Sequence, residues 1–196
     1  MTYSVSTHYQ VADPSAMIER APAIREKLIA SGANGASLIQ PIAAGPFVDS
    51  MIAISAWNSL DASIEGLGKL YADPDIKALR EVNPTLGRSI ARQMASFGDI
   101  DGQFIGVVVF NASGFAERGA EIAWEKCKAH GLPALRISQF IAGGDNVGSY
   151  RAMFFANSLD AWAQTIVDLL ADNEYISEMG RINFEPVFRG IARRFG

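Results

Sequence analysis

The sequence predicts an α+β protein made of two similar halves, each with the element order βαββαβ. Two observations carry this prediction: a long internal repeat, and strand-like and helix-like hydrophobic spacing that alternates within each half. The halves are residues 1–98 and 102–196, and the short segment Asp99–Gly102 joins them. Because this joint is so short, we expect the halves to pack into one unit.

The repeat is clearest around a shared pentapeptide. Asn58–Ala62 reads Asn-Ser-Leu-Asp-Ala and recurs 99 positions later as Asn157–Ala161. At this offset, residues 32–62 share 13 identities with their counterparts, without a gap. Near the ends of the halves, Arg88–Arg92 matches Arg189–Arg193 at an offset of 101, so two residues were inserted late in the second copy. A period near 100 residues is too long for a solenoid and indicates a duplicated domain.

Each half contains four predicted strands. The first strand of the chain alternates apolar or aromatic residues with polar ones, which is the period of a half-buried strand. The other strands are short segments rich in β-branched and aromatic residues, bounded by turn residues. The predicted ranges are Tyr3–Val11, Ala36–Ile42, Met51–Trp57 and Ser89–Phe97, then Phe104–Phe110, Leu135–Ile141, Tyr150–Ala156 and Gly190–Phe195.

Capping residues mark the predicted helices. Asp13-Pro14-Ser15 opens a helix whose apolar residues Met17, Ala21, Ile24, Leu28 and Ile29 follow helical spacing. Gly32 and Gly131 stand where a glycine ends a helix. Ser59 and Ser158 are expected to cap the second helix of each half, and Asp73-Pro74 predicts a pause in that helix.

Composition excludes several classes of protein. Hydrophobic residues make up 49% of the 196 and charged residues 19%, so the chain can bury a core and is not disordered. One cysteine excludes an intrachain disulfide framework and a cysteine-rich zinc site, and two histidines exclude a three-histidine metal centre. The net charge of −4 argues against a nucleic-acid-binding surface, which needs a basic surplus.

The termini and the apolar segments predict where the protein resides. Residues 1–8 have neither the basic nor the apolar region of a signal peptide. The longest apolar run, Phe104–Phe110, has the length of a strand and is too short for a membrane helix. With Cys127 the single cysteine, the expectation is a cytoplasmic protein.

Two segments carry a resemblance to a known superfamily. The third strand runs into Trp57-Asn58-Ser59-Leu60-Asp61-Ala62, and Ala72-Asp73-Pro74-Asp75 closes the following helix. This pattern resembles the dimeric α/β-barrel superfamily of ferredoxin-like proteins, which includes antibiotic-biosynthesis monooxygenases and the stress-responsive barrel, EthD and NIPSNAP types. Both halves carry the pattern, so the resemblance covers nearly the whole chain. The resemblance implies a fold, and fold alone does not fix an activity.

The resemblance also implies how the halves pack. A ferredoxin-like sheet has helices on one face and an uncovered second face, which an apolar sheet must bury. Single-unit members of the superfamily cover it by pairing two chains. Here we expect two tandem ferredoxin-like βαββαβ units whose antiparallel sheets pack into an intrachain α/β barrel, and further association into a homo-oligomer.

One face of the first strand holds the first candidate site residues. Ser6, His8 and Gln10 lie on that face, whereas the same offset of 99 gives Ile105, Val107 and Val109 in the second half. Unpartnered polar side chains are costly to bury, so these residues suggest a cavity that holds water or a ligand. His8 is the candidate catalytic residue because histidine titrates near neutral pH. Partial exposure of this face, with His8 an ordinary strand residue, explains the pattern equally well.

Three further residues are candidate ligand contacts. Trp57 stands opposite the much smaller Ala156 in the repeat, which either leaves a pocket or reflects ordinary core packing. Arg136 and Arg151 lie within predicted strands, where an arginine either faces solvent or an ion pair, or binds an anion inside.

The sequence leaves three functions open. The first is a barrel that binds a small hydrophobic or aromatic molecule, as a cofactor-independent monooxygenase or isomerase, with neither cofactor nor metal. The second is a structural or stress-response module with a packed interior. The third is a haem-binding barrel with His8 as the iron ligand.

Overall fold

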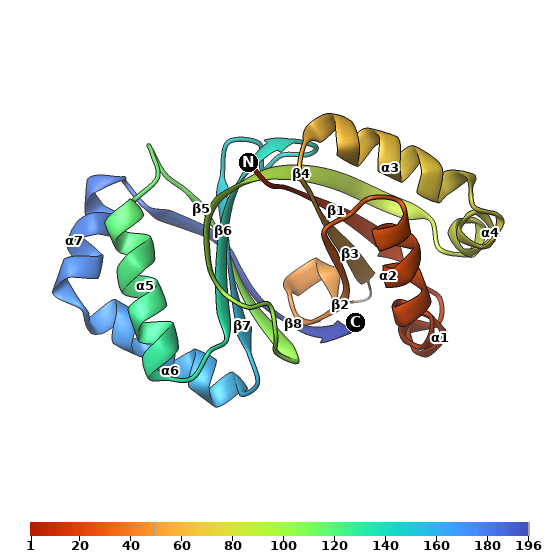
Figure 1. The fold of residues 1–196 in the computed structure, drawn as a ribbon. Coiled ribbons are helices and arrows are strands. Elements are labelled where there is room, and N and C mark those ends of the chain that lie inside the picture. Colours follow the sequence, from red (N-terminus) through yellow and green to blue (C-terminus); the bar gives the residue numbers. More distant parts are fainter. Residues whose placement is uncertain (49, 196) are drawn as a thin grey trace.

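The computed structural model describes residues 1–48 and 50–195, with the side chain of Pro46 left aside, and its strands form one closed barrel (Figure 1). The strand order is β1-β3-β2-β8-β5-β7-β6-β4, and every neighbouring pair is antiparallel. The predicted fold class is therefore confirmed. The strands are β1 (Tyr3–Gln10), β2 (Gly35–Ala43), β3 (Ser50–Trp57), β4 (Thr85–Gly98), β5 (Phe104–Asn111), β6 (Ala134–Ala142), β7 (Tyr150–Ala156) and β8 (Glu185–Phe195).

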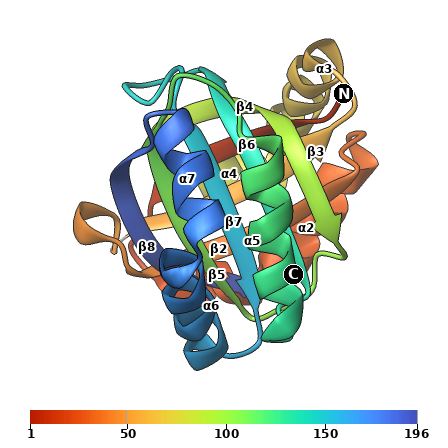
Figure 2. The same cartoon turned by 90° about the vertical axis from the view of Figure 1, so that its left-hand side faces the viewer.

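Helices cover the outside of the barrel in two separate groups. One group flanks β1–β4 and the other flanks β5–β8, so the barrel lies between two helical layers (Figures 1 and 2). The first group is α1 (Pro14–Glu19), α2 (Ala21–Ala30), α3 (Leu60–Ala72) and α4 (Pro74–Val82). The second is α5 (Glu117–Ala129), α6 (Leu159–Ala171) and α7 (Asn173–Arg181), and a 3₁₀ turn, Gly45–Phe47, lies between β2 and β3.

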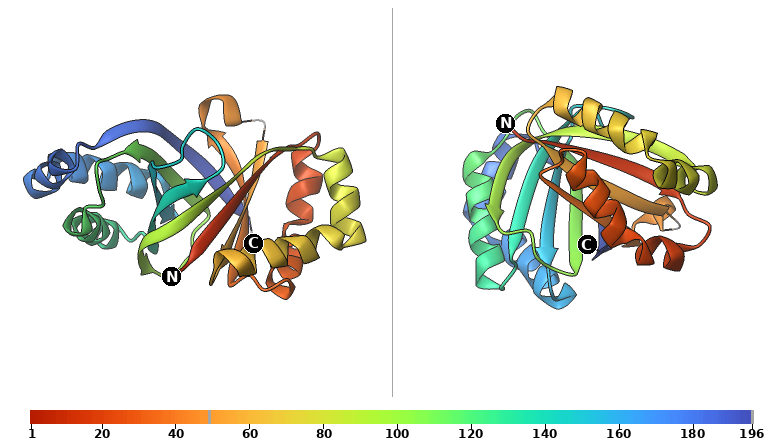
Figure 3. Two further views of the ribbon diagram at one scale, coloured as in Figure 1. Left: turned by 90° about the horizontal axis from the view of Figure 1, so that it is seen from above. Right: turned by 45° about the vertical axis from the view of Figure 1, so that its right-hand side comes forward.

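The barrel closes along two seams between the halves of the chain. Along one seam β2 pairs with β8, with Gln40 opposite Arg193, and along the other β4 pairs with β6, with Gln93 opposite Ser138. Seen from above, the two sheets face one another across the interior (Figure 3). Each sheet thus covers the face that the other would leave exposed.

The predicted caps are present. The side chains of Asp13, Ser59, Asp73 and Ser158 each accept a hydrogen bond from a backbone N–H in the first turn of the following helix. Gly32 and Gly131 follow α2 and α5 with φ of 106° and 72°, a conformation that glycine adopts without strain.

The single helix expected after Asp13 is wrong, because the structure divides it into α1 and α2 at Arg20. Pro22 in the first turn of α2 explains the break. Proline has no N–H to donate, and its ring clashes with the carbonyl of Ile18 four residues earlier, so a continuous helix is blocked.

The main apolar clusters lie between the sheets and their helices. In the first half Trp57 is fully buried beside Val5 and Leu67, and its indole N–H donates to the hydroxyl of Ser55 at 2.8 Å. In the second half Leu135, Phe154 and Cys127 belong to one larger cluster. Since these clusters stabilise each half from the outside, the barrel interior is left for other side chains. Within the described ranges, no helix is long and apolar enough to span a bilayer.

Candidate functional site

The interior of the barrel contains a cavity of about 310 Å³. Ser6 and His8 of β1 face it, whereas Thr7 and Tyr9 lie between the strand and the helices. This is the alternation that a strand imposes on successive side chains. The volume is near the lower end for ligand pockets in proteins. The remaining wall is largely apolar and includes Ile39, Ile52, Ile54, Val107, Val109, Phe140 and Met153.

Aromatic side chains stand at one end of this cavity. Phe47, in the 3₁₀ turn, packs edge-on against the imidazole of His8, with 5.7 Å between ring centroids. Phe47 also packs edge-on against Phe188 of β8, at 6.1 Å between centroids. Phe47 is 40% exposed, so its ring stands between the cavity and solvent.

Arg151 of β7 is the buried charge of this cavity. It is 6% exposed, and its side chain crosses the interior to β1, where its terminal nitrogens donate to Ser6 Oγ at 2.8 Å and Ser4 Oγ at 3.0 Å. The guanidinium carbon also lies 5.2 Å from the ring centroid of Phe140. Arg151 Nε is buried without a hydrogen-bond partner, and no described carboxylate pairs with the guanidinium.

The electrostatics of the cavity favour a neutral histidine beside a cation. Burial lowers the pKa of Arg151 to about 10, which still leaves it charged at neutral pH. Burial first, and the charge of Arg151 second, hold the pKa of His8 below its ordinary value of 6.5. The imidazole is therefore neutral at pH 7 and able to accept a proton.

A second cavity, of about 370 Å³, occupies the opposite end of the barrel. Ile39, Ile54 and Met153 line both cavities and separate them. Arg136 lies in this second cavity, apart from His8, and its guanidinium donates to the backbone carbonyls of Phe97, Leu135 and Gly98.

The structure brings some of the predicted site residues together and leaves others apart. Ser6, His8 and Arg151 share the 310 Å³ cavity. Gln10 is exposed at the end of β1 and lines neither barrel cavity. Trp57 points to the helical layer, where it is fully buried. We therefore leave Gln10 and Trp57 out of the candidate site.

Strand register explains the misplacement of Gln10. Tyr3 pairs with Trp57 in the first half, and Phe104 pairs with Ala156 in the second, so β1 and β5 correspond at an offset of 101. At that offset Ser4, Ser6 and His8 match Ile105, Val107 and Val109, and Gln10 matches the exposed Asn111. The offset of 99 used for the sequence comparison is wrong for this strand.

Three aromatic residues of the site were not predicted from the sequence. Phe140 alternates with Arg136 and Ser138 along β6, so strand periodicity could have placed it on the inner face. Phe47 lies in a turn and Phe188 near the start of β8. At such positions the spacing of residues in the sequence does not indicate which way a side chain points.

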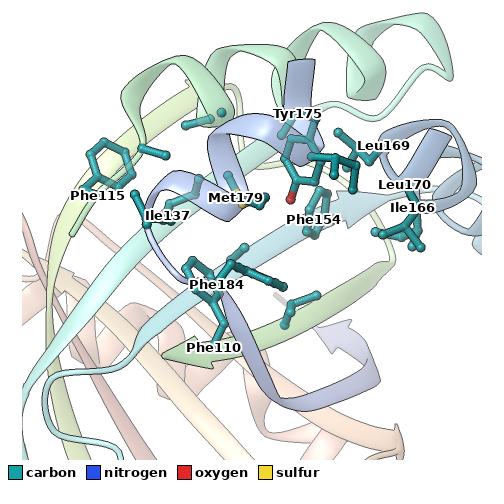
Figure 4. Close-up of a pocket in the computed structure, with 18 of the residues that line it drawn as sticks. Phe110, Phe115, Ile137, Phe154, Ile166, Leu169, Leu170, Tyr175, Met179 and Phe184 are labelled. Carbon is teal, nitrogen blue, oxygen red and sulfur yellow. The ribbon is translucent and has the colours of Figure 1, made fainter. Parts of the chain in front are cut away.

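A third hollow, of about 110 Å³, lies outside the barrel between the second sheet and its helices. Figure 4 shows Phe110 and Phe154 of the sheet opposite Tyr175 and Met179 of α7 around it. Its lining is almost wholly apolar, and the burial of Tyr175 raises the pKa of that phenol to about 12. Tyr175 and Arg189 are the polar side chains in this lining, and neither of the two histidines is among them.

The side chains around the cavities decide which metals or prosthetic groups the protein could hold. The described residues place no group of three or more His, Cys, Asp or Glu side chains together as metal ligands. Haem with His8 as the iron ligand would need more room than the 310 Å³ cavity alone provides. Its large macrocycle would have to displace the partition of Ile39, Ile54 and Met153 and enter both cavities.

Solved structures share this fold over nearly the whole chain. A haem-binding protein from Thermus thermophilus matches with a TM-score of 0.62 at 11% identity, covering 100% of this chain and 91% of that one. A candidate monooxygenase from Lactobacillus acidophilus matches with 0.61 at 13% identity, covering 98% and 92%. An anthrone oxidase-like protein matches with 0.58 at 12% identity, covering 100% and 92%. No protein-family model matches the chain, and no curated protein matches it. At these identities the likeness is one of fold.

Proposed function

We propose, given that the chain has the ferredoxin-like dimeric α/β-barrel fold, that its 310 Å³ cavity binds a small, mainly apolar molecule carrying an acidic oxygen. The observation that carries this proposal is Arg151, a buried cation without a described carboxylate partner, held in an apolar cavity. A buried charge normally has a counter-ion, because an isolated one is costly in a medium of low polarity. A phenolate, enolate or carboxylate would supply that counter-ion.

Ser4 and Ser6 are positioning residues in this proposal. Their hydroxyls accept hydrogen bonds from Arg151 and fix the guanidinium against the inner wall of β1. Because neutral hydroxyls leave the positive charge uncompensated, the guanidinium can still attract an anion. The apolar wall would contact the body of the ligand, which suits an aromatic or polyketide-like molecule.

His8 is the proposed catalytic residue. Its neutral imidazole would remove a proton from a phenol or from a carbon beside a carbonyl, and Arg151 would stabilise the anion that forms. Return of the proton to another carbon gives an isomerase. Reaction with dioxygen as co-substrate gives a monooxygenase: a CH2 group becomes C=O, and the second oxygen atom leaves as water with both hydrogens. Neither route needs a bound cofactor.

A ligand pair that differs only in charge tests the binding step. We expect 2-naphthoate to bind at least about tenfold more tightly than neutral 2-naphthamide, since a charged hydrogen bond contributes roughly 1.5–3 kcal/mol. Arg151→Gln should remove this preference, and Arg193→Gln, at an exposed arginine of β8, should keep it. Equal binding of the two ligands by the wild-type protein would exclude the proposed anion site.

Oxygen uptake tests the chemical step. With anthrone as substrate, the wild-type protein should consume dioxygen, and His8→Val should lower the rate by roughly 10²-fold or more. If the naphthoate preference is found without turnover of anthrone or another enolisable substrate, the protein is a binding module, the second function that the sequence leaves open. A Soret band in the protein purified from its source would favour the haem-binding alternative.

Self-association is a separate part of the proposal. The helical layers and hairpins remain available on the outside of the barrel, so we propose that the chain forms a homo-oligomer. Sedimentation at micromolar concentration tests this, and a single species near 21.1 kDa would contradict it.

A further inference from the structure

The second barrel cavity has a different character from the first. It has a volume of about 370 Å³, lies at the end of the barrel near the joint between the halves, and is lined by Arg25, Arg136 and Arg194. Ile39, Ile54 and Met153 lie between it and the cavity that holds His8, and Ser4, a hydrogen-bond partner of Arg151, is part of its wall. It therefore requires its own explanation.

Arg136 is fixed in this cavity by neutral partners. Its guanidinium donates to three backbone carbonyls, those of Phe97, Leu135 and Gly98, on β4 and β6. These bonds set the direction of the side chain and supply no negative charge. Half-burial lowers the pKa of Arg136, and the more distant charge of Asp99 opposes that shift.

Arg194 is fixed in the same way on β8. Its Nε donates to Ser37 Oγ at 2.9 Å and its Nη1 to the carbonyl oxygen of Gly102 at 3.3 Å. Burial is the main effect on the pKa of Arg194 and lowers it; the charge of Asp101 opposes this shift, and the charge of Arg25 adds to it. Two guanidinium groups are thus oriented in one cavity with their charges uncompensated by a direct partner.

Ser138 adds an unused hydrogen-bonding group. It is 5% exposed, it lines the cavity on β6, and its hydroxyl is buried without a hydrogen-bond partner. Buried hydroxyls in folded proteins are almost always hydrogen-bonded, so an unpaired one beside a cavity points to a bound molecule or water.

The charge of the whole interior supports this interpretation. The described residues that line the two barrel cavities include three arginines on barrel strands, Arg136, Arg151 and Arg194, and the exposed Arg25 of α2, and no aspartate or glutamate is among them. The chain as a whole has a net charge of −4. An acidic protein with an arginine-lined interior has concentrated its positive charge where a ligand would be enclosed.

We propose that the 370 Å³ cavity is a second ligand site, which binds the oxyanion of a small organic carboxylate or phosphate through Arg136 and Arg194, with Ser138 as a further hydrogen-bond donor. The planar guanidinium fork suits both kinds of oxyanion. This site is independent of the function proposed above, because it uses neither His8 nor Arg151.

Titration calorimetry at fixed ionic strength tests the proposal with two probes, inorganic phosphate and benzoate. We expect at least one of them to bind the wild-type protein, and the stronger one identifies the oxyanion. Arg136→Gln and Arg194→Gln should each weaken binding about tenfold or more. The control is Arg193→Gln, which removes a charge from an exposed neighbour on the same strand and should leave binding unchanged.

Three results would overturn the proposal. The first is that neither probe binds. The second is that Arg193→Gln weakens binding as much as the two cavity variants do. The third is that Arg151→Gln weakens binding while Arg136→Gln and Arg194→Gln do not, which would assign the binding to the first cavity. Should the variants fail to fold, the Nε–H signals of Arg136 and Arg194 in the wild-type protein supply the test. The proposal requires them to shift on titration, and constant signals would contradict it.

Discussion

Arg151 on β7 donates a hydrogen bond to Ser6 on β1 at 2.8 Å, across a separation of 145 positions in the chain. The bond crosses the inside of the barrel and connects the two halves at a point where their backbones do not pair. It also places the most buried charge of the interior within the same cavity as His8.

Arg151→Met should separate binding from stability. Replacing a buried, uncompensated charge by an apolar side chain of similar length is often neutral or stabilising, although Ser4 and Ser6 lose a partner. We expect the free energy of unfolding to stay within about 1 kcal/mol of wild type or to rise, and 2-naphthoate binding to be lost. Urea unfolding and fluorescence titration measure the two quantities. A loss of several kcal/mol would instead assign Arg151 a structural role.

The titration of His8 should appear in the pH dependence of stability. Its pKa is lower in the folded chain than the ordinary 6.5, so between the two values the unfolded chain binds more protons. The stability due to neutral His8 is therefore fully present above pH 6.5 and is lost as the pH falls through the folded pKa. Urea unfolding at stepped pH should show this slope in the wild type.

Two variants identify the source of that slope. His8→Val should flatten this slope and keep or raise stability at low pH, while lowering turnover by roughly 10²-fold or more. Val107→Ala, on the same inner surface, should keep the slope and lower stability by about 1–2 kcal/mol through the lost methyl groups. An unchanged slope and unchanged activity in His8→Val would make His8 an ordinary strand residue.

Phe47→Ala should alter ligand exchange more than folding. The ring is 40% exposed and contacts His8 and Phe188 at the end of the cavity, so its removal opens a path to solvent at little cost in packing. Stopped-flow displacement of bound 2-naphthoate should give a faster dissociation rate, with a melting temperature close to wild type. An unchanged rate would place the entrance elsewhere.

Two glycines of α3 should respond in opposite ways to the same substitution. A Cβ at Gly66 would lie 2.2 Å from the ring of the fully buried Trp57, whereas one at Gly68 would meet nothing within 4 Å. We expect Gly66→Ala to destabilise by about 2 kcal/mol or more and Gly68→Ala to stabilise by up to about 1 kcal/mol. Thermal unfolding of the matched pair measures both, and similar values for the two would contradict the packing of Trp57.

A fragment of residues 1–98 should not remain a soluble monomer. Without the second half, the inner face with Ile39, Ile52 and Ile54 and the strands β2 and β4 would lose their partners. Analytical ultracentrifugation should show aggregation or self-pairing. A folded monomer would show that the first half is an independent domain.

The sequence was sufficient to predict the strands, most of the helices and part of the site, although it did not predict the break between α1 and α2. Caps such as Asp13 and Ser59 act through local hydrogen bonds, so they could be recognised from the order of residues alone. The alternation of side chains along β1 indicated that Ser6 and His8 share one face of the strand, and that face is the inner one. Which way the Trp57 side chain points, and which residue of the second half corresponds to Gln10, depended on the register between strands. An ungapped sequence offset does not determine that register.

The arginines show a second limit of sequence reasoning. A strand arginine such as Arg151 is equally compatible with solvent and with the interior until the pairing of its strand is known. Its neutral partners, Ser4 and Ser6, come from the other half of the chain, and no local pattern connects them.

Closure of the barrel has a consequence for the behaviour of the protein in a crowded cell. Each of the eight strands is bonded on both sides, so among the described residues no row of free backbone donors and acceptors is offered to a neighbouring molecule. Strand addition, the usual route from a β-rich protein to fibrous aggregates, would first have to break a seam. The seam between β2 and β8 has only a few paired residues and an irregularity at Pro41, where proline has no N–H to donate. Resistance to aggregation should therefore depend on how rarely the hydrogen bonds between these few residue pairs open.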